Sequence, residues 1–264
     1  MTQIGHEAGI ILKSPRELAQ MREASWVAAV VLEEVAQKVR PGVTTAELDD
    51  VAVNEVRKRG AVASFKGYRG FPASICTSVN EEVVHGIPGN RVLKEGDIIS
   101  LDFGAQLNGF HGDAAMTMGV GRIGSEAQKI IDAARGALEA GIAAARIGAR
   151  LGDVSAAIQS HAEARGFSVV REYVGHGIGR QLHEDPQVPN FGIAGEGPVL
   201  QKGMTMALEP MLNAGVWRTR VAEDKWTVIT VDGKLSAHFE HTIAIDDNGP
   251  EILTKLQGFP EGVI

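Results

Sequence analysis

Residues 98–113 read IISLDFGAQLNGFHGD, and this stretch predicts a β-hairpin around which the rest of the chain is arranged. Its central Asn-Gly dipeptide, flanked by β-like segments, indicates a two-residue turn. Counting outward pairs Leu107 with Phe110, and hence Gly104 with Asp113. Because side chains alternate along a strand, Asp102 and Asp113 are expected on one face, about 7–8 Å apart at the backbone. Two like charges at that separation call for a cation between them.

Apolar segments lead directly into two of the acidic residues. Ile98 to Leu101 precedes Asp102, and Met204 to Leu208 precedes Glu209. An isolated pair of hairpin carboxylates is more often solvent-facing. Acids at the ends of buried strands, however, require partners or a metal ion. The apolar flanks therefore favour a binding site over ordinary surface carboxylates.

An internal repeat extends from this hairpin in both directions. Each anchor of the first half recurs 106 or 107 residues later, as shown by Arg40-Pro41-Gly42 with Arg146-Ile147-Gly148, Arg59-Gly60 with Arg165-Gly166, and Val92–Gly96 with Val199–Gly203. We interpret the chain as one catalytic domain, 1–264, built from two homologous halves at about 14–122 and 123–250 around a pseudo-two-fold axis. Convergent helix caps are the alternative explanation. The repeat places Asp102 and Glu209 in equivalent positions.

Two helices are predicted before the first strands. Ser14-Pro15-Arg16-Glu17 combines an N-cap, a proline at the first helical position and a capping-box glutamate, so a helix is expected from there to about Val39. A second helix should begin at Thr44 or Thr45 and end at Arg59-Gly60, where glycine follows a basic last turn.

Two further residues complete a candidate metal-binding set. Glu240 lies on a second predicted hairpin, turned by Asp232-Gly233, and His176 lies in a Gly-His-Gly-Ile-Gly segment whose glycines leave the imidazole reachable. Alone, Glu240 would more often be a solvated strand residue and His176 a bystander in a glycine-rich turn. Four carboxylates and one imidazole would neutralise two divalent cations, and a set rich in oxygen and free of thiolate suits a two-metal hydrolytic site.

Composition limits the class of protein. The chain has 264 residues, 44% of them hydrophobic, so it can bury a sizeable core, and its net charge of −7 argues against broad binding to nucleic acid or anionic membranes. Its single cysteine, Cys76, cannot form an internal disulfide and fits a reducing compartment. The first 13 residues lack the features of a signal peptide, and no apolar run approaches about 18 residues. A cytoplasmic protein is expected.

These motifs together resemble the type I methionine aminopeptidases. The resemblance runs from about Ser14 to Asn248 and is carried by five segments in order: Leu101-Asp102-Phe103, Gly112-Asp113, Gly175-His176-Gly177-Ile178-Gly179, Leu208-Glu209-Pro210 and Phe239-Glu240-His241-Thr242. It implies the pita-bread α/β fold, with antiparallel sheet, outer helices and two pseudo-symmetric halves. It also implies removal of the initiator methionine from nascent proteins whose second residue is small.

The resemblance assigns a role to each member of the set. Asp102 would chelate one metal, Asp113 and Glu240 would bridge both, and His176 with Glu209 would complete the other. A hydroxide bridging the two metals would attack the first peptide bond, with Glu209 shuttling the proton. The type of ligand does not select among cobalt, manganese, iron and zinc.

The resemblance also implies the substrate site. His85 matches the family histidine near the scissile amide, and His183 matches the one that stabilises the tetrahedral intermediate. The methionine pocket would be lined by Tyr68, Phe71, Cys76 and Trp226. Aromatic walls and a sulfur atom suit a thioether. Phe71 stands where several bacterial relatives carry tyrosine, and Phe65 where some carry cysteine, so the polarity of this pocket is left open.

Two other functions remain as alternatives. A proline-specific aminopeptidase of the same superfamily would share the metal chemistry but usually carries a large amino-terminal domain. A catalytically inactive peptide-binding relative would have lost ligands, whereas this sequence retains all five. Only 13 residues precede the first helix cap and 32 lie between His176 and Glu209, which favours type I over type II. A monomer acting on nascent chains, with transient ribosome contact, is expected.

Overall fold

A computed structural model describes residues 9–256. Most of the amino-terminal segment predicted to lack a signal peptide, residues 1–8, lies outside the described residues. No helix in the part that is described has the length and apolarity needed to cross a bilayer. The four α-helices are α1 (Pro15–Ala36), α2 (Thr45–Lys58), α3 (Ser125–Ala144) and α4 (Leu151–Glu163), with one 3-10 turn, η1 (Tyr68–Gly70).

The strands form one large antiparallel sheet and two small ones. The large sheet has nine strands in the order β1-β4-β5-β14-β9-β7-β8, with β2 on β4 and β15 on β14. Its members are β1 (Val62–Ala63), β2 (Cys76–Val79), β4 (Ile98–Leu107), β5 (Phe110–Gly119), β7 (Gly175–Gly177), β8 (Glu184–Val188), β9 (Thr205–Leu208), β14 (Glu240–Asp246) and β15 (Gly249–Ile252). The small sheets contain β3 (Glu82–Val84), β11 (Thr219–Val221) and β12 (Val228–Thr230), and β6 (Ser168–Val169), β10 (Met211–Asn213) and β13 (Ser236–His238).

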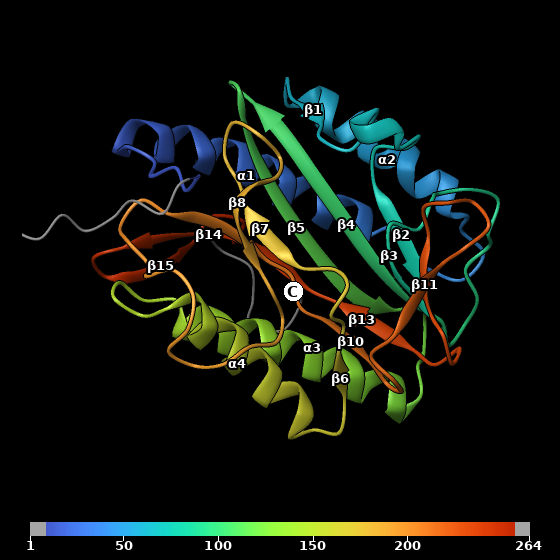
Figure 1. The fold of residues 1–264 in the computed structure, drawn as a ribbon. Coiled ribbons are helices and arrows are strands. Elements are labelled where there is room, and N and C mark those ends of the chain that lie inside the picture. The colour runs from blue at the N-terminus through green and yellow to red at the C-terminus, as the bar shows by residue number, and fades with distance from the viewer. Residues whose placement is uncertain (1–8, 257–264) are drawn as a thin grey trace, which may run out of the picture.

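The helices cover the outside of this curved sheet in two pairs. Helices α1 and α2 lie along one half, and α3 and α4 along the other (Figure 1). One continuous apolar core joins the helices to the sheet, with Phe103, Ile130 and Leu208 fully buried in it. Burying apolar side chains from both layers is what holds the helices on the sheet. The pita-bread arrangement expected from the sequence is confirmed.

Both predicted amino-terminal helices begin where their caps indicate. Ser14 and Glu17 form a capping box at the start of α1, and Thr44 and Glu47 form one at the start of α2. In each box the carboxylate accepts the N–H of the cap residue and the cap hydroxyl accepts the N–H three residues on, so two otherwise free donors are satisfied. Helix α1 ends at Ala36, three residues before the expected end.

The repeated anchors take the same local structure in both halves. The N–H of Gly42 donates to the carbonyl of Leu93 at 2.8 Å, and that of Gly148 donates to the carbonyl of Leu200 at 3.0 Å. Both glycines have positive φ, 91° and 83°, where a side chain would be strained. This recurrence explains why the repeat is visible in the sequence. The exact boundaries of the halves stay a prediction.

The expected hairpin at Asp232-Gly233 is wrong. The chain does turn there, but β12 pairs with β11 and β3, while β13 pairs with β10. The Asp232 carboxylate accepts the N–H groups of Lys234 and Val216, and therefore binds the turn to a neighbouring loop instead of closing a two-stranded ladder. The strands on either side of the turn diverge into different sheets.

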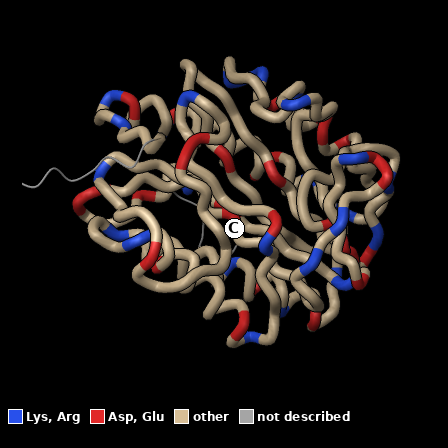
Figure 2. The backbone as a smooth tube through the Cα atoms, in the orientation of Figure 1, with Lys and Arg blue, Asp and Glu red and all other residues tan. Residues whose placement is uncertain are grey.

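Charged residues are spread over the outside of the molecule. In the view of Figure 2, both acidic and basic segments lie around the periphery. The net charge of the whole chain is −7.

Candidate active site

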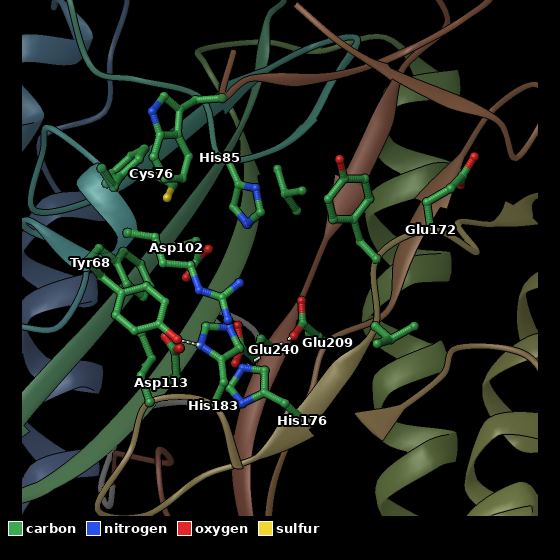
Figure 3. A pocket seen from close by; sticks show the side chains of 18 residues that line it. Tyr68, Cys76, His85, Asp102, Asp113, Glu172, His176, His183, Glu209 and Glu240 are labelled. Atoms are coloured by element: carbon green, nitrogen blue, oxygen red, sulfur yellow. Dashed lines mark hydrogen bonds and ion pairs between the residues drawn. The ribbon is translucent and has the colours of Figure 1, made fainter. Parts of the chain in front are cut away.

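Five adjacent strands bring the predicted metal-binding residues together. Asp102 lies on β4, Asp113 on β5, Glu240 begins β14, Glu209 follows β9, and His176 lies on β7. The sheet order β4-β5-β14-β9-β7 places these strands side by side, so residues separated by up to 138 positions, from 102 to 240, face one another (Figure 3).

The hairpin that carries the two aspartates has the expected register. Leu107 pairs with Phe110, and Gly104 pairs with Asp113. The backbone at Asp113 is further fixed by Thr242, whose hydroxyl accepts the Asp113 N–H at 2.9 Å and donates to the Asp113 carbonyl at 2.8 Å. The direction of the Asp113 carboxylate is thus set by two strands, not by the hairpin alone.

The acidic side chains meet at short range in a buried place. Nε2 of His176 lies 3.6 Å from Oε1 of Glu209, and ligand atoms of Asp113, His176 and Glu240 all lie within 4.8 Å of one another. Within residues 9–256, one carboxylate oxygen of each of Asp102, Asp113 and Glu240 is buried without a hydrogen-bond partner. Buried, unpaired carboxylate oxygens are costly unless something else binds them.

The environment shifts the pKa of every carboxyl in this cluster upward. Burial raises the pKa of Asp113 to about 7, although its backbone contact with Ala114 acts in the opposite direction. Burial and the neighbouring carboxylates likewise raise the pKa of Asp102, Glu209 and Glu240 well above their usual range. The protein has gathered groups that repel one another when charged, which is costly without a cation.

The donor set fits divalent cations. Carboxylate oxygens and one imidazole nitrogen are borderline to hard ligands, and the described site offers them without a thiolate. Burial lowers the pKa of His176 to about 4, so the imidazole is neutral near pH 7 and its lone pair is available. Nδ1 of His176 contacts the carbonyl oxygen of Gly177 at 2.9 Å, which leaves Nε2 to face Glu209.

The glycines around His176 serve a purpose other than exposure. A Cβ on Gly175 would lie 2.4 Å from the Ala207 carbonyl oxygen, and one on Gly177 would lie 2.1 Å from that of Asp185. Neighbouring backbones therefore approach too closely for any side chain. The small size of both residues thus lets β7 fit between β8 and β9.

A cavity of about 310 Å³ opens beside the cluster. Every site residue predicted from the sequence lines it: Phe65, Tyr68, Phe71, Cys76, His85, Asp102, Asp113, His176, His183, Glu209, Trp226 and Glu240. Phe71 and Trp226 meet edge to face with ring centroids 5.2 Å apart, and Cys76 is buried in the same apolar cluster. One wall of the cavity is thus apolar and aromatic, and its floor is acidic.

The two further histidines, His85 and His183, both line the cavity. His85 has φ 61° and stacks edge to face on Tyr173, with ring centroids 5.7 Å apart. Positive φ at a residue with a side chain stores strain that functional sites often carry. Nδ1 of His183 contacts the Tyr68 hydroxyl at 2.9 Å. Burial lowers the pKa of His85 to about 4 and holds that of His183 below its usual range, so both rings are neutral near pH 7.

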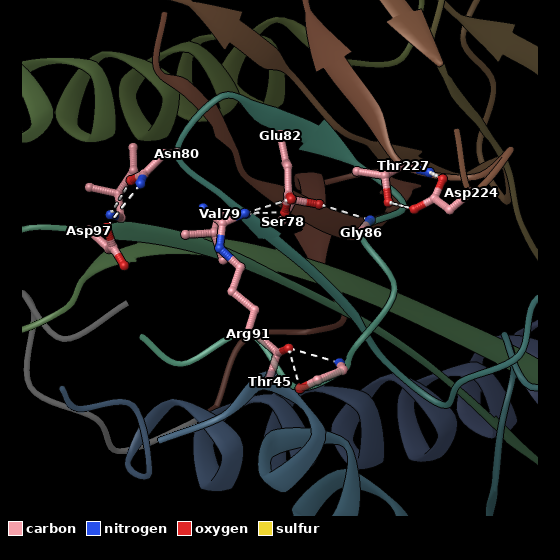
Figure 4. A network of polar contacts seen from close by, with 12 residues as sticks. Thr45, Ser78, Val79, Asn80, Glu82, Gly86, Arg91, Asp97, Asp224 and Thr227 are labelled. Atoms are coloured by element: carbon pink, nitrogen blue, oxygen red, sulfur yellow. Dashed lines mark hydrogen bonds and ion pairs between the residues drawn. The ribbon is translucent and has the colours of Figure 1, made fainter. Parts of the chain in front are cut away.

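A polar network holds the segments that carry His85 and Trp226 (Figure 4). The N–H of Gly86, next to His85, donates to the Ser78 hydroxyl at 3.2 Å. The Trp226 N–H donates to Asp224 at 2.9 Å, and Asp224 also accepts the Thr227 hydroxyl at 2.5 Å. These bonds fix loop residues whose positions no secondary-structure pattern would define.

Six other residues line the cavity without having been predicted from the sequence. They are Arg69, Val84, Glu172, Tyr173, Val174 and Leu182. Arg69 directly follows Tyr68 and Leu182 directly precedes His183, so nearness to a predicted residue is the only signal the sequence offers. Tyr173 has no comparable signal, because its place is set by the fold.

Comparison with known proteins agrees with this geometry. Residues 19–247 match the sequence profile described as metallopeptidase family M24. The chain belongs to metallopeptidase family M24. The chain is therefore an enzyme, a peptidase that uses a divalent metal ion.

Individual M24 relatives are similar over almost the whole chain. Methionine aminopeptidase 1 from Bacillus subtilis is 54% identical over 247 residues, which cover 94% of this chain and 100% of the relative. The crystal structure of methionine aminopeptidase from Thermotoga maritima superposes with a TM-score of 0.92 at 49% identity, covering 94% of this chain and 100% of that one.

A proline-directed peptidase shares the fold at lower sequence identity. The Xaa-Pro dipeptidase from Bacillus anthracis has a TM-score of 0.75 at 24% identity, covering 93% of this chain but 62% of its own. This likeness concerns the fold alone. The M24 fold therefore supports more than one specificity, and the lining of the cavity has to distinguish them.

Proposed function

We propose that this chain is a methionine aminopeptidase, which removes the amino-terminal methionine of proteins whose second residue is small. The observation that carries the proposal is one cavity with two unlike walls. Phe71, Cys76 and Trp226 offer an apolar, polarizable surface of the kind that suits a thioether, directly beside the buried acidic cluster. Methionine aminopeptidases that are 54% and 49% identical over 94% of the chain support the same activity.

The acidic cluster would hold two divalent cations. Asp102, Asp113, His176, Glu209 and Glu240 are the ligands we propose, and their four carboxylates balance the charge of two such ions. Two observations support this assignment. Asp102, Asp113 and Glu240 each have a buried carboxylate oxygen without a hydrogen-bond partner among the described residues, and the pKa values of all four carboxyl groups are raised. When bound, the cations would supply a water molecule activated for attack and would polarise the scissile carbonyl. Cobalt, manganese, iron and zinc all suit this donor set.

Glu209 would move the proton during hydrolysis. It lies at the edge of the cluster, 3.6 Å from His176, and burial together with Asp102 and Asp113 raises its pKa. A raised pKa keeps a carboxylate basic enough to accept a proton near neutral pH. We assign it the transfer from the attacking water to the leaving amide nitrogen.

The neutral histidines would bind the reacting amide. If the Tyr68 hydroxyl donates to Nδ1 of His183, the imidazole proton lies on Nε2, where it can donate to the oxygen of the scissile carbonyl. His85, which lines the same cavity, would contact the same peptide group. Both roles require neutral rings, and the lowered pKa values of His85 and His183 support that state.

The cellular setting follows from this function. We propose that the enzyme acts in the cytoplasm as a monomer on nascent chains, with transient contact to ribosomes. The buried free thiol of Cys76 supports a reducing compartment.

The test is metal-dependent release of methionine. Metal-depleted protein supplemented with manganese or cobalt should cleave Met-Ala-Ser, should leave Met-Lys-Ser intact, and should not cleave Ala-Pro peptides. Asp113→Ala should abolish the activity, whereas Asp132→Ala, which removes an exposed carboxylate on α3, should not. Cleavage of Ala-Pro in preference to Met-Ala would favour the proline-specific alternative. Absence of cleavage with every metal would leave an inactive peptide-binding relative.

A further inference from the structure

His238 occupies a position that a metal-cluster residue fills in the other half of the molecule. In β4 and β5, Asp113 pairs with Gly104, two residues beyond Asp102. In β10 and β13, His238 pairs with Met211, two residues beyond Glu209. Asp102 and Glu209 are equivalent in the repeat. His238 therefore has the same position relative to Glu209 that Asp113 has relative to Asp102.

Two threonines confirm this equivalence. Thr242 holds the backbone of Asp113 by accepting its N–H at 2.9 Å and donating to its carbonyl at 2.8 Å. Thr117 holds the backbone of His238 in the same way, with both distances 2.8 Å. Thr242 of the second half thus fixes Asp113 of the first half, and Thr117 of the first half fixes His238 of the second. The direction of the His238 side chain is as strictly set as that of Asp113.

The imidazole of His238 is buried against the acidic cluster without a hydrogen bond at its tip. Its side chain is 1% exposed, and Nε2 has no partner in the described part of the chain. Nε2 lies 3.9 Å from Oε2 of Glu209 and 3.8 Å from Oε2 of Glu240. A buried imidazole nitrogen seldom remains unpaired. Its nearest candidates are therefore these two carboxylates.

The two oxygens of Glu209 face different histidines. Oε1 lies 3.6 Å from Nε2 of His176, whereas Oε2 lies on the side of His238. One oxygen is thus placed to share a cation with His176 and the other is turned away from it. Closing the gap between His238 and Oε2 to a hydrogen bond requires a shift of only about 1 Å.

We propose that His238 is a positioning residue of the metal centre. Its Nε2–H holds Oε2 of Glu209 and so leaves Oε1 free for the cation shared with His176. The inference rests on the proposed function, because it gives Glu209 a metal-binding role. Groups that orient metal ligands in this way set the affinity of a site as well as its activity.

The test compares two substitutions by titrating metal-depleted protein with Mn²⁺ in a calorimeter. His238→Leu fills similar space without a donor, and His238→Gln restores an N–H at similar reach. We expect the leucine variant to bind Mn²⁺ about 10–100-fold more weakly, and the glutamine variant to bind nearly as tightly as the parent. At saturating Mn²⁺, kcat for Met-Ala-Ser should fall in the leucine variant while KM changes little.

Three outcomes would overturn the proposal. Equal weakening in both variants would make His238 a direct ligand, because glutamine is a poor substitute for imidazole on a metal. Unchanged affinity in both would make it a filler of space. If the parent chain itself binds no metal, the proposed function fails, and the role of His238 fails with it. Thermal unfolding of the metal-free variants separates these results from loss of the fold.

Discussion

The hydroxyl of Tyr68 lies 2.9 Å from Nδ1 of His183, and the two rings stack with centroids 5.2 Å apart. This contact joins the η1 turn to the segment after β7, two parts of the chain separated by 115 residues. It fixes the orientation of the His183 ring.

Tyr68→Phe should therefore lower kcat/KM by about 3–10-fold, the effect of losing one hydrogen bond of roughly 0.5–1.5 kcal/mol. Steady-state kinetics on Met-Ala-Ser would measure it. The control is the same substitution in a His183→Ala background, where it should have almost no further effect. Additive losses in the double variant would contradict the coupling.

Metal removal should destabilise the protein more at pH 8 than at pH 5. The pKa of Asp113 is raised to about 7 in the folded state, so between its unfolded value near 3.8 and about 7 the folded protein binds more protons than the unfolded one. Its contribution to stability therefore falls as the pH rises through this window. Thermal unfolding of chelator-treated protein across pH 5–8 would show it.

Asp113→Asn supplies the control, since it removes the titrating group. The metal-free variant should show a flatter pH dependence than the parent. In the parent protein, added Mn²⁺ should restore stability chiefly above pH 7, where the carboxylates of the cluster are deprotonated. A parent chain that grows more stable on metal removal at pH 8 would rule out a cation at this cluster.

Gly177→Ala should reduce the free energy of unfolding by about 1–3 kcal/mol, because its Cβ would lie 2.1 Å from the Asp185 carbonyl oxygen. Gly89→Ala is the matched control, since nothing lies within 4 Å of the added Cβ. Urea denaturation of both variants would measure the difference. Equal effects would mean that β7 and β8 can separate without cost.

Lys13→Met should destabilise the protein by about 3–5 kcal/mol. Lys13 and Glu184 form an ion pair whose side chains are only 3% and 4% exposed, so the substitution leaves a buried carboxylate unpaired beside His183. Lys202→Met, which breaks an exposed pair with Asp246, should change the stability far less, because solvent screens that pair. Chemical denaturation would compare them, and similar losses would show that burial of the first pair has no energetic effect.

Local chemistry let the sequence determine part of this structure. The register of β4 and β5 follows from one Asn-Gly turn and strand alternation, and the caps at Ser14 and Thr44 fix the starts of α1 and α2. The repeat is readable because the same backbone hydrogen bonds, such as those of Gly42 and Gly148, demand the same residues twice. Short-range constraints of this kind act within a few residues, so they leave a pattern in the chain.

Tertiary structure decided the rest, because it depends on atoms far apart in sequence. The turn at Asp232 looked like a hairpin, yet its carboxylate binds Val216 and the strands diverge. His238 gained its position only when β13 packed beside Glu209. Sequence alone thus indicated which side chains suit a metal and a methionine, while the packing of distant strands determined that they share one buried cavity and which neighbours orient them.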